Sequence, residues 1–170
     1  MRANRRQISK RTEREGLESS ESPLDAVGWR ILCELQENAR LSFSELGRRV
    51  GLTPPAVAER VRRLEEDGII GGYRLELDIE KLGLPLSAFV RVAVRNAAGS
   101  EIRRAVVDMP EVLECYHVTG EDCYVLRVAV PSVKHLEGLL ERLLRFGSTT
   151  TSIVISTPVS RRIVEHRADS

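Results

Sequence analysis

The sequence has little of what membrane, secreted and metal-binding proteins need. No run of about 18 apolar residues occurs, so no segment is long enough for a membrane-spanning helix. The first residues are polar and charged where a signal peptide needs an apolar core. We therefore expect a cytoplasmic protein that makes no membrane contact.

Cysteine and histidine are scarce, with three of each in 170 residues. They lack the spacing of a zinc site or a disulfide framework; they are Cys33, Cys115 and Cys123, and His117, His135 and His166. We expect reduced cysteines, no metal site and no cofactor.

Net charge is also nearly absent, at +1. A protein that coats nucleic acid needs a strongly basic balance, so any contact with DNA must come from a local surface. Residues 1–22 are rich in Arg, Glu and Ser and have almost no apolar periodicity. We expect this segment to be a disordered, solvated arm.

Three short helices are predicted after this arm. The first covers residues 24–38, with Asp25 as its N-cap. The second begins after Ser42, whose spacing to Glu45 matches a capping box. The third runs from Thr53, a suitable N-cap, to Gly68, which can take the left-handed conformation that ends a helix.

The last two helices are separated only by Gly51 and Leu52, which is typical of a helix-turn-helix. Residues 69–77 alternate like a strand around a Gly71-Gly72 turn and indicate the winged variant. We predict that residues 23–74 form a winged helix-turn-helix domain.

The third helix has two different faces. Val57, Val61 and Leu64 share the apolar one, and the arginines fall on the other. Arginines on a helix are by themselves typical of a solvated face. Here the short turn leaves that face outward, so we predict binding to double-stranded DNA.

The groove-facing residues follow from this placement. We expect base edges to be contacted by Pro55, Ala56, Glu59 and Arg63, and phosphate by Ser42, Ser44, Arg60 and Arg62, with Thr53 beside them at the start of the helix.

The second half of the chain predicts a different fold. Strands are expected at residues 86–95, 112–119, 123–130 and 151–157, and helices at 100–109 and 132–144. The order β-α-β-β-α-β fits a ferredoxin-like sandwich over residues 86–165, joined by a linker at 75–85 and followed by a tail at 166–170. The whole chain is then α+β.

The first strand of this sandwich predicts a partner. Val90, Val92 and Val94 point to one side, and Phe89, Arg91 and Ala93 to the other. Two helices can cover only one sheet face, so the second face has apolar side chains to bury. We expect a homodimer formed through it.

Several stretches together resemble the leucine-responsive and asparagine-type (Lrp/AsnC) family of prokaryotic transcription regulators. They are Leu24-Asp25 with Ile31-Leu32, Leu41-Ser42 with Glu45-Leu46, Arg49 to Leu52, Glu59 to Glu65, Gly68-Ile69-Ile70, Gly72-Tyr73, and Val118-Thr119-Gly120 followed by Tyr124. The resemblance implies a sequence-specific regulator with a DNA-binding first domain. It also implies a second domain that senses small molecules, commonly amino acids, and dimers that assemble into tetramers, octamers or larger discs.

The resemblance also places an effector near the turn between the second and third strands, against the last strand of a neighbouring subunit. Carried over, the positions are Val118, Thr119, Gly120, Glu121, Asp122, Cys123 and Tyr124, with Ile153, Val154 and Ile155. Backbone donors at Gly120 suit a carboxylate, and Glu121 or Asp122 could pair an ammonium. From residue chemistry alone, Gly120 fits equally well as a hairpin glycine beside solvated acids.

Three departures from the family pattern bear on this expectation. Gly28 and Cys123 each stand where the family usually has an acid, and residues 146–149 lack the usual Pro-Gly pair. Cys123 removes a partner for an ammonium, so an altered effector, or none, stays open.

Two alternatives follow. One is an architectural DNA-binding protein without an effector. The other is an enzyme, because siroheme decarboxylase subunits resemble this family in both domains; such a site needs basic side chains and a histidine, and His117 lies near the right turn. The chain is expected not to be an enzyme.

Overall fold

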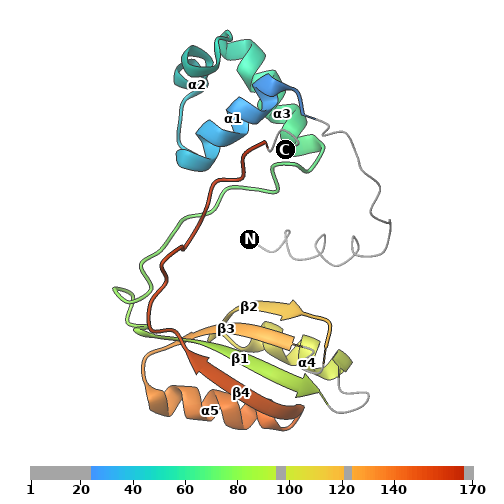
Figure 1. Ribbon diagram of the computed structural model, residues 1–170, viewed down its shortest axis with the longest axis vertical. Helices are drawn as coiled ribbons and strands as arrows, with labels where there is room; N and C mark the ends of the chain where they lie inside the picture. Colours follow the sequence, from blue (N-terminus) through green and yellow to red (C-terminus); the bar gives the residue numbers. More distant parts are fainter. Residues whose placement is uncertain (1–23, 95–98, 121–123, 167–170) are drawn as a thin grey trace. The chain divides into compact units, whose positions relative to one another are not determined.

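The computed structural model describes residues 24–94, 99–120 and 124–166, and the chain divides into two compact units (Figure 1). Unit 1 combines Met1–Tyr73 with Arg162–Ser170, and unit 2 is Arg74–Arg161. Each unit has its own hydrophobic core. The two are therefore described separately.

Unit 1 contains three helices: α1 (Ala26–Glu37), α2 (Phe43–Val50) and α3 (Pro54–Glu66). The side chain of Asp25 accepts the Gly28 N–H at 2.6 Å, and the Ser42 hydroxyl accepts the Glu45 N–H at 3.2 Å. Thr53 occupies the N-cap position of α3 without a side-chain cap bond. All three predicted helices are present.

The turns after α2 and α3 depend on glycine. Gly51 and Gly68 have φ angles of 76° and 71°, in the left-handed region that other residues rarely adopt. The core beneath them comes from all three helices: Ile31, Leu35, Leu46, Val50, Val57, Val61 and Leu64. The apolar face predicted for α3 is the buried one.

The strand predicted at residues 69–77 is wrong, because the structure has no strand there. Ile69 and Ile70 are half-buried and pack against the core of unit 1. After them the chain is exposed, with Tyr73 49%, Leu75 84% and Leu77 58% accessible. An alternating pattern makes a strand only where a second strand pairs with it, and Gly71-Gly72 is followed by no such partner.

Unit 2 is a four-stranded antiparallel sheet with two helices on one face (Figure 1). Its elements are β1 (Leu86–Val94), α4 (Gly99–Ala105) with a following 3₁₀ turn η3 (Val106–Asp108), β2 (Val112–His117), β3 (Tyr124–Val130), α5 (Val133–Leu144) and β4 (Gly147–Ile153). The strand order β2-β3-β1-β4 is that of a ferredoxin-like sandwich, as predicted.

The last strand lies four residues earlier than predicted. β4 spans Gly147–Ile153 rather than 151–157, so Val154 and Ile155 fall beyond it. The apolar Ile153-Val154-Ile155 suggested the strand, but the pairing is made by the Ser/Thr run before it, whose β-branched threonines suit a strand. Only the Val154 N–H continues the ladder, to the Ser87 carbonyl at 2.9 Å.

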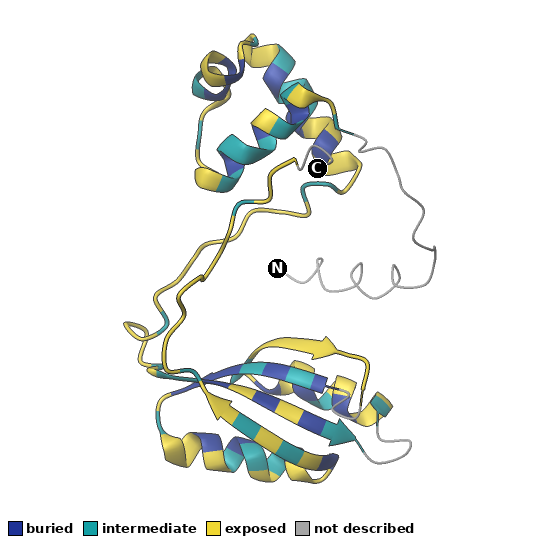
Figure 2. Ribbon diagram, viewed as in Figure 1, coloured by how far each residue is buried: buried dark blue, intermediate teal, exposed yellow. Residues whose placement is uncertain are grey.

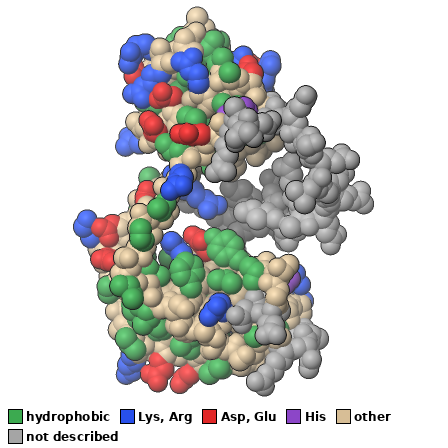
Figure 3. All heavy atoms as spheres, viewed as in Figure 1, with side chains coloured by type: hydrophobic (Ala, Val, Ile, Leu, Met, Phe, Trp, Pro, Cys, Tyr) green, Lys and Arg blue, Asp and Glu red, His purple; other side chains and the backbone are tan. Residues whose placement is uncertain are grey.

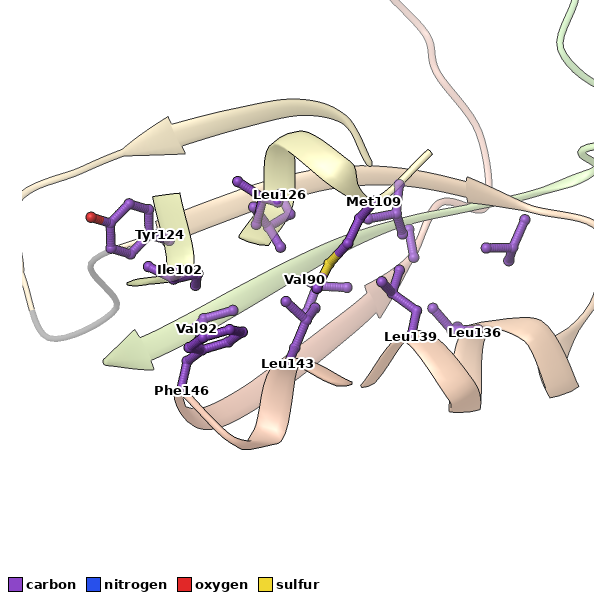
Figure 4. Close-up of a cluster of buried hydrophobic side chains, with 14 residues drawn as sticks. Val90, Val92, Ile102, Met109, Tyr124, Leu126, Leu136, Leu139, Leu143 and Phe146 are labelled. Atoms are coloured by element: carbon purple, nitrogen blue, oxygen red, sulfur yellow. The ribbon is translucent and has the colours of Figure 1, made fainter. Parts of the chain in front are cut away.

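The core of unit 2 lies between the sheet and its helices (Figure 4). Val90 and Val92 of β1 are fully buried there against Leu139 and Leu143 of α5 and their neighbours. Burial alternates along β1 (Figure 2). Phe89, on the opposite face, is 41% exposed. Nothing among the described residues covers that second face.

None of the helices that the structure describes is long and apolar enough to cross a membrane.

Candidate nucleic-acid interface and effector region

Helix α3 is held by one face and displays the other. Val57, Val61 and Leu64 are buried in the core of unit 1. Pro55 at the helix start and Arg62 and Arg63 further along are exposed, while Ala56 and Glu59 are partly exposed. This side of α3 is therefore exposed, as a helix that enters a DNA groove requires.

Glu59 is the centre of a charge cluster on that open side. Its Oε2 accepts from Arg62 Nε at 2.9 Å, and its Oε1 accepts from Arg62 Nη2 at 2.8 Å and Arg63 Nε at 2.9 Å. Arg62 also donates to Glu66. Hydrogen bonds from Arg62 and Arg63 lower the pKa of Glu59 to about 2, so this carboxylate is charged at any physiological pH.

Arg60 points elsewhere. Its Nη1 donates to both oxygens of Asp25, at 2.9 and 2.8 Å, and so connects α3 to the N-cap of α1. The Gly28 N–H and Arg60 together lower the pKa of Asp25. Arg60, which was predicted to contact phosphate, therefore joins two helices of unit 1 in this structure.

Helix α2 brings two arginines that the predicted interface did not include. Glu45 accepts from Arg48 Nη2 at 2.7 Å and from Arg49 Nε at 2.8 Å, and Arg49 Nη1 reaches Glu34 of α1 at 2.7 Å. Ser42 is engaged as N-cap, and Ser44 is exposed. The sequence signal for Arg48 and Arg49 was two basic residues in the last turn of α2, next to its buried Val50.

Basic and acidic side chains are therefore interleaved over unit 1 (Figure 3). Each of the five arginines between residues 42 and 66 donates to at least one carboxylate; the five are Arg48, Arg49, Arg60, Arg62 and Arg63. Because these carboxylates offset the arginines, the candidate interface has little net charge.

A segment from the far end of the chain lies against α1. The Gln36 side-chain amide donates to the Val164 carbonyl at 3.0 Å and accepts the Val164 N–H at 2.9 Å. The rings of Trp29 and His166 lie 5.4 Å apart between centroids. Residues up to 165 were predicted to belong with the second domain; nothing in their sequence pattern indicates this contact.

The predicted effector residues divide into two groups in unit 2. Val118, Thr119 and Gly120 are exposed after β2, and Glu121, Asp122 and Cys123 lie outside the described residues. Tyr124 is only 3% exposed; its hydroxyl donates to the Gly99 carbonyl at 3.0 Å, and its ring stacks on His117. Its side chain therefore belongs to the core.

The second group lies at the opposite corner of the sheet. β2 and β4 are the two edge strands. His117 pairs with Tyr124 at one end of β3, whereas Ile153 pairs with Ala88 near the other end of β1. Ile153 is 52% and Ile155 97% exposed, and Val154 is half-buried. A single chain therefore does not bring the predicted effector residues together.

Two shallow hollows lie on the helix side of unit 2. One is lined by Glu111, Lys134, His135, Gly138 and Arg142, and the other by Glu101, Arg104, Ala105, Asp108, Arg145 and Phe146. Neither contains a predicted effector residue. Within the described part of the chain, no group of three His, Cys, Asp or Glu side chains could hold a metal ion.

Comparison with known proteins follows the division into two units. Residues 24–70 match the model of a winged helix-turn-helix DNA-binding domain, and residues 87–164 match the model of the Lrp/AsnC ligand binding domain.

Among curated proteins, the HTH-type transcriptional regulator LrpC of Bacillus subtilis is 38% identical over 133 residues, which cover 78% of this chain and 92% of LrpC. The leucine-responsive regulatory protein of Escherichia coli is 38% identical over 139 residues, covering 78% of this chain and 85% of that protein.

Solved structures agree with the sequence relatives. Bacillus subtilis LrpC superposes with a TM-score of 0.78 at 37% identity, over 81% of this chain and 99% of that one. A complex of the transcriptional regulator NMB0573 of Neisseria meningitidis with L-Met has a TM-score of 0.78 at 32% identity, over 83% of this chain and 96% of that one.

Proposed function

Because the chain belongs to the Lrp/AsnC family of transcriptional regulators, with a winged helix-turn-helix followed by a ligand-binding domain, we propose that it regulates transcription in response to an amino acid. The observation that carries the DNA-binding part of this proposal is the open side of α3, which is anchored by Val57, Val61 and Leu64 and displays charged side chains outward.

The proposed DNA contacts follow the two kinds of readout. Base edges are assigned to Pro55, Ala56, Glu59 and Arg63, and phosphate to Ser42, Ser44, Thr53 and Arg62. Arg60 remains in the proposed phosphate set, but its guanidinium has to leave Asp25 to reach DNA. The exposed Arg48 and Arg49 of α2 add two candidate phosphate contacts near Ser44, and each has to leave its carboxylate partner to reach DNA.

The proposed assembly is a homodimer, on which tetramers or octamers can be built. Its support is the uncovered sheet face, where Phe89 is 41% and Tyr116 51% exposed. Exposed aromatic side chains of this kind are typical of interfaces. A two-fold axis through the dimer predicts a pseudo-palindromic operator.

The proposed effector is an amino acid bound between subunits. NMB0573, with a similar structure, binds L-Met in its complex. In the present chain the two groups of candidate residues lie at opposite corners of one sheet, so a site that uses both needs residues from a neighbouring subunit. Cys123 in place of an acid favours an effector that differs from that of the typical family member.

The test is a genome-wide selection of DNA fragments by the purified protein, with and without a pool of the twenty amino acids. A shared motif with two-fold symmetry, occupied differently in the presence of the pool, is the expected result. Enrichment that is equal with and without the pool would instead support an architectural DNA-binding protein without an effector. No enrichment over random fragments in either condition would contradict sequence-specific binding.

A further inference from the structure

The open side of α3 carries its own negative charge at the point where DNA would approach. Glu59 holds Arg62 through two hydrogen bonds and Arg63 through a third, at 2.8 to 2.9 Å. We propose that Glu59 is a specificity determinant, which withholds Arg62 and Arg63 from phosphate until a base in the groove takes their place as its partner. This inference rests on the DNA-binding function proposed above.

Apart from Glu66, which contacts Arg62 within α3, the other acidic partners of the interface arginines connect elements of unit 1. Asp25 caps α1 and receives Arg60 from α3. Arg49 links Glu45 of α2 to Glu34 of α1. The Glu59 cluster differs, because all of its members belong to α3 and lie on its exposed side. Exposed pairs within one helix contribute little to stability, so the fold does not require this cluster.

The cluster affects binding to any DNA, whatever its sequence. Non-specific affinity comes from arginine and lysine neutralising phosphates. For Arg62 or Arg63 to neutralise a phosphate fully, its charge has to be shifted from Glu59 to that phosphate. Glu59 is then left charged and unpaired close to the DNA backbone, where like charges repel. Sites that offer only phosphate are therefore penalised.

A specific site removes this penalty. A carboxylate in the major groove can accept a hydrogen bond from the cytosine N4 amino group. When such a base faces Glu59, the carboxylate keeps a partner and both arginines are released for guanine or phosphate. Discrimination of this kind works by making the wrong sites unfavourable.

The test is Glu59→Gln in the full chain, which keeps the size of the side chain and removes its charge. Glu66→Gln is the matched control, because Glu66 contacts Arg62 on the same helix but leaves the Glu59 bonds intact. Fluorescence anisotropy measures binding to a random duplex and to a duplex selected by the wild-type protein, over about 50 to 200 mM salt.

For Glu59→Gln we expect about tenfold tighter binding to random DNA and a salt slope steeper by about one to two, since each phosphate neutralised adds about 0.9. The ratio of selected to random affinity should fall by about tenfold or more. Glu66→Gln should stay within about threefold of wild type. Suppose that wild type prefers its selected site but that Glu59→Gln changes neither the affinity for random DNA nor the salt slope. That result would overturn the inference. A wild-type protein without such a preference would overturn the proposed function itself.

Discussion

At the scale of single residues, Gly47 is a position where the turn after α2 leaves no room for a side chain. A Cβ atom at this position would lie 2.5 Å from the Leu52 carbonyl oxygen and 3.5 Å from Val57 Cγ2. The Gly47 carbonyl itself accepts the N–H groups of Gly51 and Leu52 at 2.8 and 2.9 Å. The turn of the helix-turn-helix therefore closes directly over this glycine.

Gly47→Ala should lower the free energy of unfolding of unit 1 by about 1 to 3 kcal/mol, because the backbone has to move to admit the methyl group. Urea unfolding followed by the fluorescence of Trp29, the single tryptophan, measures the change within this unit. Gly71→Ala is the control, since its Cβ would meet nothing within 4 Å. Equal midpoints for the two variants would contradict the close approach seen at Gly47.

Arg63 differs from Arg62 in having one carboxylate partner rather than two. If it reads a base bidentately, Arg63→Ala should weaken binding to the selected DNA by roughly 5- to 150-fold, with a smaller loss on random DNA. Anisotropy titrations on both duplexes measure this, and Arg40→Ala, exposed between α1 and α2, is the control. Equal weakening on both duplexes would show that Arg63 contacts only phosphate.

At the scale of elements, the start of α1 is fixed by Asp25. Its carboxylate accepts from the Gly28 N–H and from Arg60, so it joins the first helical turn to α3. Gly28 fits this arrangement: a Cβ there would lie 3.1 Å from Leu24 Cδ2 and 3.2 Å from Asp25 Oδ1. Helix α1 therefore has a side-chain cap at its start although position 28 carries no acid.

This cap makes part of the stability of unit 1 dependent on pH. The pKa of Asp25 is lower in the folded chain than its usual 3.8, first because of the Gly28 N–H and then because of Arg60. The carboxylate therefore stabilises the fold fully above the unfolded pKa, and this contribution is lost as the pH falls through the lower folded value.

Asp25→Ala should lower the free energy of unfolding by about 1 kcal/mol near pH 6, and Asp25→Asn, which retains a capping group, by less. Both variants should lose less stability than wild type when urea unfolding is repeated near pH 3. A wild-type pH dependence retained in Asp25→Asn would show that other carboxylates account for it.

The uncovered face of the sheet in unit 2 leads to a prediction about assembly. Phe89→Glu places a charge on that face, where burial in a dimer would be costly. Sedimentation velocity at micromolar concentration should find wild type as a dimer or larger and Phe89→Glu as a smaller species. Val107→Glu, at a position 65% exposed in η3, should behave as wild type. An unaltered Phe89→Glu dimer would place the interface elsewhere.

Local patterns in the sequence were enough to predict the helices of unit 1 and the order of elements in unit 2. As helix caps, Asp25, Ser42 and Gly68 act within one turn of where they stand, so these capping roles can be read without knowing the fold. The strand predicted at 69–77 was wrong and the one predicted at 151–157 was displaced by four residues, because strand formation depends on which segment pairs with which. The Glu59 cluster depends on side-chain rotamers, and the Gln36–Val164 contact joins residues far apart in the sequence. The periodicity of apolar residues predicts neither.

At the scale of the whole molecule, unit 1 is built from two distant parts of the chain. Gln36 on α1 makes two hydrogen bonds with the backbone of Val164, and unit 2 accounts for residues 74–161 between them. The burial of Trp29 is only partial, and its ring lies beside that of His166.

Gln36→Ala should lower the free energy of unfolding of unit 1 by about 1 kcal/mol, since both hydrogen bonds are near the surface. Hydrogen exchange should show faster exchange of the Val164 amide, and Trp29 fluorescence should report the lower stability. Glu37→Ala, at the exposed neighbouring position, should change neither. Val164 exchange equal to wild type in Gln36→Ala would mean that the segment is held by other contacts.

The discontinuous construction of unit 1 also orders events during translation. Residues 24–73 leave the ribosome first, but the segment that lies on α1 follows only after residues 74–161 have been made. At 5 to 20 residues per second this takes roughly 4 to 18 s, during which the Gln36 side of α1 is without its cover. A nascent chain therefore completes the unit that contains its helix-turn-helix only once the ligand-binding unit has already been synthesised.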